Sequence, residues 1–138
     1  MSKVMVTGTF DVLHDGHRDM FKQAKAFADS LIVVVARDAT VEVVKGKKPL
    51  HNEKKRLKDV QAEPLVDKAV LGDLDDKYKA IELEKPDLIC LGYDQLAFTD
   101  LLEEELLRRD LDIVVRRLKP YMPEKYKSSK IKENLKKE

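Results

Sequence analysis

The sequence predicts an α/β fold built on a doubly wound, parallel, five-stranded sheet. Short apolar segments alternate with amphipathic segments along the 138 residues, which is the pattern of βαβ units. Residues 31–36, LIVVVA, form an unbroken apolar strand of the kind that parallel sheets bury on both faces. A glycine-containing turn at residues 8–17 follows the first apolar strand and opens a helix. Open parallel sheets bind their ligands at such strand-to-helix turns.

The expected strands are residues 3–8, 31–36, 66–72, 87–92 and 113–118. Right-handed crossovers and one reversal of winding give the strand order 3-2-1-4-5. Strands 1 and 4 are then neighbours, so the loops that follow them share one crevice.

The expected helices are placed by periodicity and end signals. The first spans residues 18–29 and carries on one face Met20, Phe21, Ala24, Phe27 and Ala28. The second helix ends at Gly46, and the third begins at the cap Asn52. The fourth has the acidic residues Asp73, Asp75 and Asp76 at its start. The fifth spans residues 96–109.

Composition excludes several classes of protein. The chain is 38% charged with a formal net charge of +1, which lacks the dominant positive sign of nucleic-acid-binding proteins. Its single cysteine, Cys90, rules out an internal disulfide and fits a reducing compartment. No apolar run reaches membrane-spanning length. We therefore expect a soluble, cytoplasmic protein with no nucleic-acid or membrane partner.

The turn GTFDVLHDGH, residues 8–17, carries the side chains with most chemistry to offer. Gly8 lets a ligand approach the backbone closely, and Gly16 lets the chain bend into the helix. His14 and His17 stand at the start of that helix, where amide N–H groups and the helix dipole favour anions. The pair indicates a site at which phosphate is bound and at which the histidines also take part in the chemistry.

Two other interpretations of the histidine pair stay open. The rings cap the helix or pack in the core, or they share a metal ion. A metal ion needs a third ligand, and His51 is the remaining histidine. Asp11, within the turn, is expected to brace that turn by accepting from backbone N–H groups.

The pattern G-T-F-D-x-x-H-x-G-H resembles the signature of the HxGH nucleotidyltransferases. This superfamily contains small cytidylyltransferases, pantetheine-phosphate adenylyltransferase and archaeal FAD synthases. The tail Ser128-Ser129-Lys130-Ile131 resembles their second signature, a Ser/Thr pair followed by Lys-Ile. The resemblance implies one Rossmann-like nucleotidyltransferase domain over residues 1–138, in which residues 119–138 form a C-terminal loop and helix. It also implies that an acceptor phosphate attacks the α-phosphorus of a nucleoside triphosphate, without a covalent enzyme intermediate.

The resemblance further implies roles for individual residues. His14 and His17 are the catalytic residues, which contact the phosphates and the transition state. The other nucleotide-binding residues are Gly8, Thr9, Phe10, Asp15, Gly16, Asp94, Tyr121, Ser128 and Ser129.

Each of these roles has a structural alternative. Asp94 accepts from the ribose or the base, or forms a turn. Ser128 and Ser129 offer hydroxyls and amides to the β- and γ-phosphates, or form an ordinary N-cap, although Lys132 prevents a complete capping box. Tyr121 contacts the nucleotide or simply packs.

Basic residues in the middle of the chain are candidates for contact with phosphate. Lys45 and Lys47, like Lys48, lie in a basic loop and neutralise triphosphate or pyrophosphate, or are merely solvated. Arg56 lies in the following helix, where it reaches phosphate or forms an ion pair on the surface.

Residues 35–50, together with VDKAVLG and LGYDQ, look most like archaeal FAD synthases. The resemblance therefore implies ATP and FMN as substrates, Mg²⁺ accompanying ATP, and a homodimer. One alternative is a glycerol-3-phosphate cytidylyltransferase or another transferase acting on a small phosphate. Those enzymes carry an Arg roughly where Tyr121 lies, and Arg116 or Arg117 is a possible substitute here. The other alternative is a nucleotide-binding module without catalysis.

Overall fold

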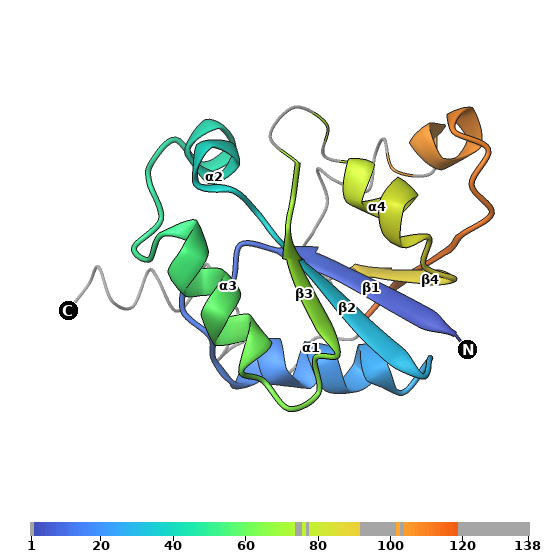
Figure 1. Cartoon of the computed structure of the whole chain (residues 1–138), viewed down its shortest axis with the longest axis horizontal. Coiled ribbons are helices and arrows are strands. Elements are labelled where there is room, and N and C mark those ends of the chain that lie inside the picture. Colours follow the sequence, from blue (N-terminus) through green and yellow to red (C-terminus); the bar gives the residue numbers. More distant parts are fainter. Residues whose placement is uncertain (1, 74–75, 77, 92–101, 103, 119–138) are drawn as a thin grey trace.

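The computed structural model describes residues 2–73, 76, 78–91, 102 and 104–118. Its centre is an all-parallel sheet of five strands: β1 (Lys3–Gly8), β2 (Ser30–Val35), β3 (Lys68–Leu71), β4 (Leu88–Leu91) and β5 (Val114–Arg117). The strand order is β3-β2-β1-β4-β5, which confirms the predicted order (Figure 1). The winding reverses between β3 and β4, so β1 and β4 are neighbours at the switch point.

The register of β1 against β2 fixes where the two chains leave the sheet. The pairing runs from Lys3 opposite Ser30 to Gly8 opposite Val35. One residue further on, the N–H of Ala36 still donates to the carbonyl of Gly8, at 2.9 Å. The segments after β1 and β2 therefore leave the same edge of the sheet side by side.

Helices cover both faces of the sheet. They are α1 (Asp15–Lys25), α2 (Asp38–Lys45), α3 (Glu53–Gln61) and α4 (Lys79–Glu84), and residues 104–108 are also helical. The strands alternate their side chains between two apolar clusters, as their period of two requires. Val4 and Val6 pack with Phe21 of α1 and Val60 of α3, whereas Met5 packs on the opposite face with α4.

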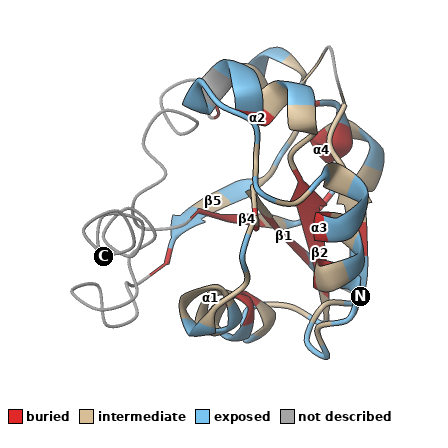
Figure 2. Ribbon diagram, turned by 90° about the vertical axis from the view of Figure 1, so that its left-hand side faces the viewer, coloured by how far each residue is buried: buried red, intermediate tan, exposed pale blue. Residues whose placement is uncertain are grey.

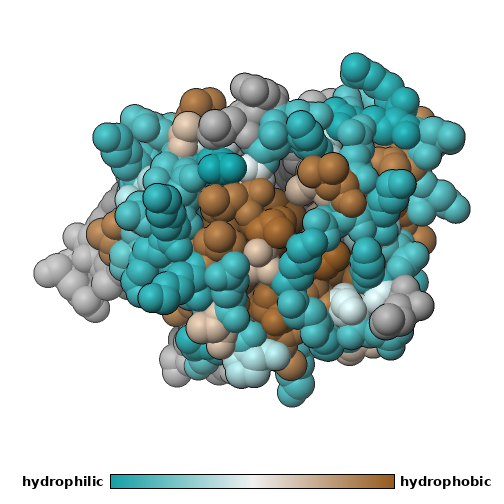
Figure 3. Space-filling model, in the orientation of Figure 1, coloured by the Kyte–Doolittle hydropathy of each residue, from teal (hydrophilic) through white to brown (hydrophobic). Residues whose placement is uncertain are grey.

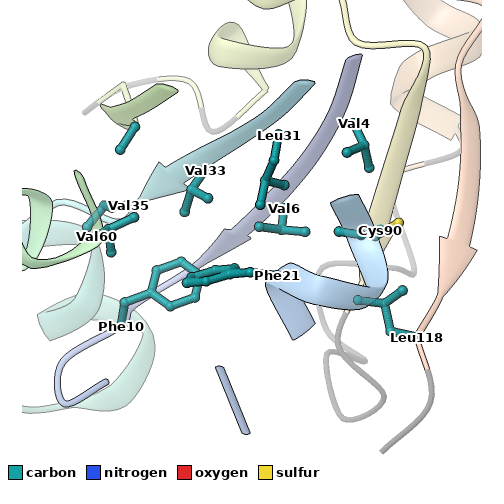
Figure 4. Packing of buried hydrophobic residues seen from close by; sticks show 12 residues of the cluster. Val4, Val6, Phe10, Phe21, Leu31, Val33, Val35, Val60, Cys90 and Leu118 are labelled. Carbon is teal, nitrogen blue, oxygen red and sulfur yellow. The ribbon is translucent and has the colours of Figure 1, made fainter. Parts of the chain in front are cut away.

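Buried residues concentrate in the central strands (Figure 2). In β2, Leu31, Val33 and Val35 have no exposed surface, which fits the apolar run from which this strand was predicted. Figure 4 shows the cluster on the α1 side, where the rings of Phe10 and Phe21 lie together near Val6 and Val33.

Most predicted element ends are close to the observed ends, and the exceptions are the first helix and the start of α4. α1 begins at Asp15 because His14 caps it, and it ends at Lys25. Phe27, predicted for the buried face, lies beyond the helix and is 50% exposed. The guanidinium of Arg116 sits 5.6 Å from its ring centre instead. The prediction that Phe27 is part of the buried face is therefore wrong.

The end signals of the middle helices behave as expected in two cases. Gly46 ends α2 with φ 77°, in the left-handed region that favours glycine. The side chain of Asn52 caps α3 by accepting from the N–H of Lys55. The acidic residues behave differently, because Asp73 and Asp76 form turns before α4, which begins only at Lys79. Asp75 lies outside the described residues.

The high charge content is partly organised into a network around Arg109. Its guanidinium contacts the carboxylates of Asp76, Glu82 and Glu105, each at 2.9 Å, and lies 5.3 Å from the ring centre of Tyr78. These contacts join the helical residues 104–108 to α4 and to the turn before it.

Figure 3 shows apolar side chains gathered in the middle of one face and surrounded by hydrophilic ones. Among the described residues, a hollow of about 190 Å³ lies between the end of β3 and α4, and its walls include Arg37, Leu71 and Leu83. None of the helices described is long and apolar enough to cross a membrane.

Candidate functional site

The turn between β1 and α1 is held in an unusual backbone conformation. Phe10 has φ 53°, a value that is uncommon for a bulky aromatic residue. Its ring is buried against Phe21, with ring centres 5.5 Å apart. The same ring meets His17 edge to face at 5.3 Å. Phe10 therefore turns the chain toward the helix and supports one ring of the histidine pair.

Gly8 makes room for a neighbouring side chain, which the sequence did not predict. A Cβ atom on Gly8 would lie 2.9 Å from the Cζ atom of Phe10, closer than such atoms pack. The absence of a side chain at Gly8 thus makes room for the Phe10 ring. The predicted close approach of a ligand to Gly8 is not tested by this contact.

The two histidines close the N-terminus of α1 as a capping box. The Nδ1 atom of His14 accepts from the N–H of Gly16 at 3.0 Å. The Nδ1 atom of His17 accepts from the N–H of His14 at 3.4 Å. These are the positions normally taken by a Ser or Thr and by a Glu or Gln. The rings stack with centres 3.9 Å apart.

The capping interpretation of the histidines is therefore confirmed, and it has a chemical consequence. A ring nitrogen that accepts a hydrogen bond carries no proton, so each neutral ring holds its proton on Nε2. Capping through Nδ1 thus leaves Nε2–H as the donor of each ring. Helix capping and contact with an anion use different nitrogens and are compatible.

Both rings are kept neutral by their surroundings. Burial, reinforced by the nearby His14, Lys45 and Arg18, lowers the pKa of His17 to about 3. Burial also lowers the pKa of His14, with Asp15 opposing and Arg18 adding to this effect. At neutral pH the pair consequently acts through hydrogen-bond donors rather than through positive charge.

Lys45 is brought to the histidine pair by the fold. It is the last residue of α2, and its charge is among those that lower the pKa of His17. Lys47 lies in the loop that follows α2 and is exposed. Lys45 therefore supplies positive charge beside two neutral rings.

Asp11 braces a different segment from the one predicted. Its carboxylate accepts from the N–H groups of Leu50 and His51, at 2.7 and 2.8 Å. Its carbonyl oxygen lies 2.8 Å from Nδ1 of His51. Asp11 thus ties the turn to the loop between α2 and α3 rather than bracing its own turn. The prediction that it accepts from backbone N–H groups is correct in kind, but the partner segment was wrong.

Arg56 is not a surface residue. Its side chain is 0% exposed, so the alternative of an ion pair on the surface is wrong. Its guanidinium donates to the carbonyls of His51, Thr9 and Ala36 and to the carboxylate of Asp38. These contacts use all three nitrogen atoms of the guanidinium. The structure therefore lends no support to the expected phosphate contact.

The remaining predicted residues fall into two groups. Asp15 is exposed and pairs with Arg18 at 3.3 Å, and the N–H of Gly16 is taken by His14. Four residues lie outside the described residues, namely Asp94, Tyr121, Ser128 and Ser129. Within the described ranges, no three His, Cys, Asp or Glu side chains gather in a way that could hold a metal ion.

Sequence reasoning missed the importance of Asp38 and Glu53. Glu53 accepts from the N–H of Asp38 at 3.0 Å and pairs with Arg37 at 2.8 Å, and Arg37 in turn donates to the carbonyl of Gly72. The available signal was the position of Arg37 and Asp38, directly after an apolar strand and at the same sheet edge as the glycine turn.

Comparison with known proteins identifies the family. The chain matches the model of cytidylyltransferase-like proteins over residues 5–134. The chain belongs to the cytidylyltransferase-like family. Relatives in this family include an FAD synthase from Aciduliprofundum boonei, 48% identical over 121 residues (88% of this chain and 80% of the relative). Another is an FAD synthase from Methanosarcina mazei, 44% identical over 118 residues (86% of this chain and 77% of the relative).

Solved structures agree with this family assignment. A lipopolysaccharide core biosynthesis protein from Thermoplasma volcanium superposes with a TM-score of 0.82 at 39% identity, covering 88% of this chain and 98% of that one. A pantoate-β-alanine ligase from Francisella tularensis superposes with a TM-score of 0.63 at 16% identity, covering 85% of this chain and 58% of that one. At this identity the likeness shows a shared fold alone. The resemblance inferred from the two signatures is confirmed.

The lowered pKa of His17 predicts acid sensitivity of the fold. Unfolded His17 takes up a proton near its ordinary pKa of 6.5, whereas folded His17 stays neutral to about pH 3. Between these values the unfolded chain binds more protons, so the free energy of unfolding falls as the pH falls. His17→Gln keeps a capping-box side chain but has no group that titrates. We therefore expect its free energy of unfolding to depend less steeply on pH, by up to about 1.4 kcal/mol per pH unit. Urea unfolding at pH 7, 6, 5 and 4.5 measures it, and identical slopes in both proteins would contradict it.

Proposed function

We propose that this chain is an FAD synthase, which transfers the AMP of ATP to the phosphate of FMN and releases pyrophosphate. The observation that carries the proposal is the combination of FAD synthase relatives over most of both chains with a histidine pair whose Nδ1 atoms accept hydrogen bonds at a helix N-terminus, which places the proton of each neutral ring on Nε2. The relatives support the substrates, and the pair supports the chemistry.

The reaction exchanges one phosphorus–oxygen bond for another. A phosphate oxygen of FMN attacks the α-phosphorus of ATP, the bond to the bridging oxygen of the β-phosphate breaks, and pyrophosphate leaves with that electron pair. Such transfers need positioning and stabilisation of charge on the phosphoryl oxygens rather than a protein nucleophile.

The described residues divide this work between hydrogen bonding and charge. His14 and His17 donate through Nε2–H to the oxygens on which charge develops. Donors that are fixed before the reaction stabilise that charge without reorganisation. Lys45 at the end of α2, and Lys47 two residues further on, contribute positive charge toward the leaving pyrophosphate. The backbone amides around Thr9 and Phe10 contact the nucleotide.

The residues outside the described ranges complete the proposed site. Asp94 accepts from the ribose or the base, Tyr121 contacts the nucleotide, and Ser128 and Ser129 meet the β- and γ-phosphates. ATP enters as its magnesium complex, with the ion held chiefly by phosphate oxygens and water. We further propose that the enzyme is a homodimer in the cytoplasm, which light scattering and cell fractionation test.

The first test is the reaction itself. Incubation with ATP, FMN and Mg²⁺ is expected to yield FAD and pyrophosphate in equal amounts, detected by chromatography and a coupled pyrophosphate assay. CTP with glycerol 3-phosphate is the control for the alternative cytidylyltransferase. Turnover of that pair without formation of FAD would overturn the proposal, and binding of nucleotide without any turnover would favour a non-catalytic module.

The capping geometry allows catalysis and stability to be separated at His14. Asn is a favoured N-cap, so His14→Asn retains the cap but places no donor at the position of Nε2. We expect its unfolding free energy to stay within about 0.5 kcal/mol of the original and its kcat to fall about 10²- to 10³-fold.

His14→Ala is the matched comparison, because it lacks both the cap and the donor. It is expected to lose activity and about 1 kcal/mol of stability. Denaturant unfolding and initial rates of FAD formation measure the two effects. Retention of full kcat by His14→Asn would show that the Nε2–H of His14 has no part in the reaction.

A further inference from the structure

We infer that Arg56 is a positioning residue for the transfer reaction, which sets the backbone of the β1–α1 turn and through it the histidine pair. The inference rests on the proposed function and goes beyond it, because the family signatures lie elsewhere in the chain. Arg56 lies on α3 and has no exposed surface, so in this conformation it acts through the residues that it contacts.

The contacts of Arg56 join three segments at the carboxyl edge of the sheet. Its Nε atom donates to the carbonyl of His51 at 2.9 Å. One Nη atom donates to the carbonyls of Thr9, at 2.9 Å, and Ala36, at 2.7 Å. The acceptors come from the turn after β1, the end of β2 and the loop before α3. A single planar guanidinium thus fixes the mutual positions of these segments.

A buried guanidinium is tolerated here because its charge and hydrogen bonds are matched. The second Nη atom donates to a carboxylate oxygen of Asp38 at 2.6 Å. Desolvation raises the pKa of Asp38, but hydrogen bonds from Arg56 and from the backbone of Glu53 outweigh it, and the result is a lowered pKa. Asp38 therefore stays ionised and neutralises the buried cation, which would otherwise be strongly unfavourable.

The contact with Thr9 is the one that reaches the reaction site. The Thr9 carbonyl belongs to the peptide that precedes Phe10, whose φ of 53° needs support from its surroundings. Phe10 in turn packs edge to face on His17. Rotation of the Thr9–Phe10 peptide would therefore move the ring against which His17 rests. Arg56 opposes that rotation by its hydrogen bond to the Thr9 carbonyl.

The planar fork of arginine is needed because four acceptors surround it. A lysine ammonium has three donors and no planar geometry, so Arg56→Lys leaves at least one acceptor without its partner. Small misplacements of reacting groups have large effects on rate. We expect kcat to fall about 10- to 100-fold, with the KM values for ATP and FMN within about twofold of the original because Arg56 touches neither substrate.

Arg109→Lys provides the matched control. Arg109 is also a largely buried arginine with several carboxylate partners, with 21% of its side chain exposed. Its partners lie around α4, away from the β1–α1 turn. Both substitutions are expected to lower the melting temperature, but only Arg56→Lys is expected to lower kcat per folded molecule.

The experiment measures kcat, KM and melting temperature for the two variants and for Asp38→Asn, together with the backbone amide resonances of residues 8–17. Lowered kcat with unchanged KM, and shifted resonances for Thr9, Phe10 and His17, are expected in Arg56→Lys and are not expected in Arg109→Lys. Asp38→Asn is expected to show the same pattern more weakly, and it decides the matter if Arg56→Lys is unfolded.

Two results would overturn the inference. Full kcat per folded molecule in Arg56→Lys would leave Arg56 with a purely structural role. Raised KM values with unchanged kcat would instead indicate direct contact with a substrate. The resonances also separate this inference from the proposed function, since they report on the turn even if the original protein makes no FAD.

Discussion

The site depends on two hydrogen bonds that end at imidazole Nδ1 atoms. His14 accepts from Gly16 and His17 accepts from His14, so the rings that begin α1 are also fixed by it. This arrangement places both protons on Nε2 and orients both rings by the helix backbone. Burial keeps the rings neutral. A helix terminus that already favours anions thereby gains two oriented donors.

The geometry of these hydrogen bonds depends on the conformation of the β1–α1 turn, and contacts from several segments fix that conformation. The Phe10 ring fills the space that Gly8 leaves open and packs on His17. Asp11 binds the loop before α3, and Arg56 binds the turn, the end of β2 and that same loop. The carboxyl ends of neighbouring parallel strands meet at this edge, so a few polar side chains are enough to connect them. Lys45, the last residue of α2, is close enough for its charge to lower the pKa of His17.

The sequence allowed the sheet, its strand order and the position of the histidine pair to be predicted, because these follow from apolar runs, end signals and a local motif. It did not reveal the contacts of Arg56 and Asp11, since their partners lie far away in the chain and only the fold brings them together. The same holds for Gly8, whose neighbour in space is the ring two residues on, folded back by the left-handed conformation of Phe10. The start of α1 was predicted too late because histidines are unusual in a capping box, although a helix cap was one of the interpretations that the sequence left open for them.

The protonation of the histidine pair tests this account most directly. Long-range ¹H–¹⁵N correlation spectra of the imidazole rings distinguish a proton on Nε2 from a proton on Nδ1 or on both. The account predicts that His14 and His17 are neutral at pH 7, each with its proton on Nε2. A proton on Nδ1 of either ring, or a charged ring at that pH, would contradict it.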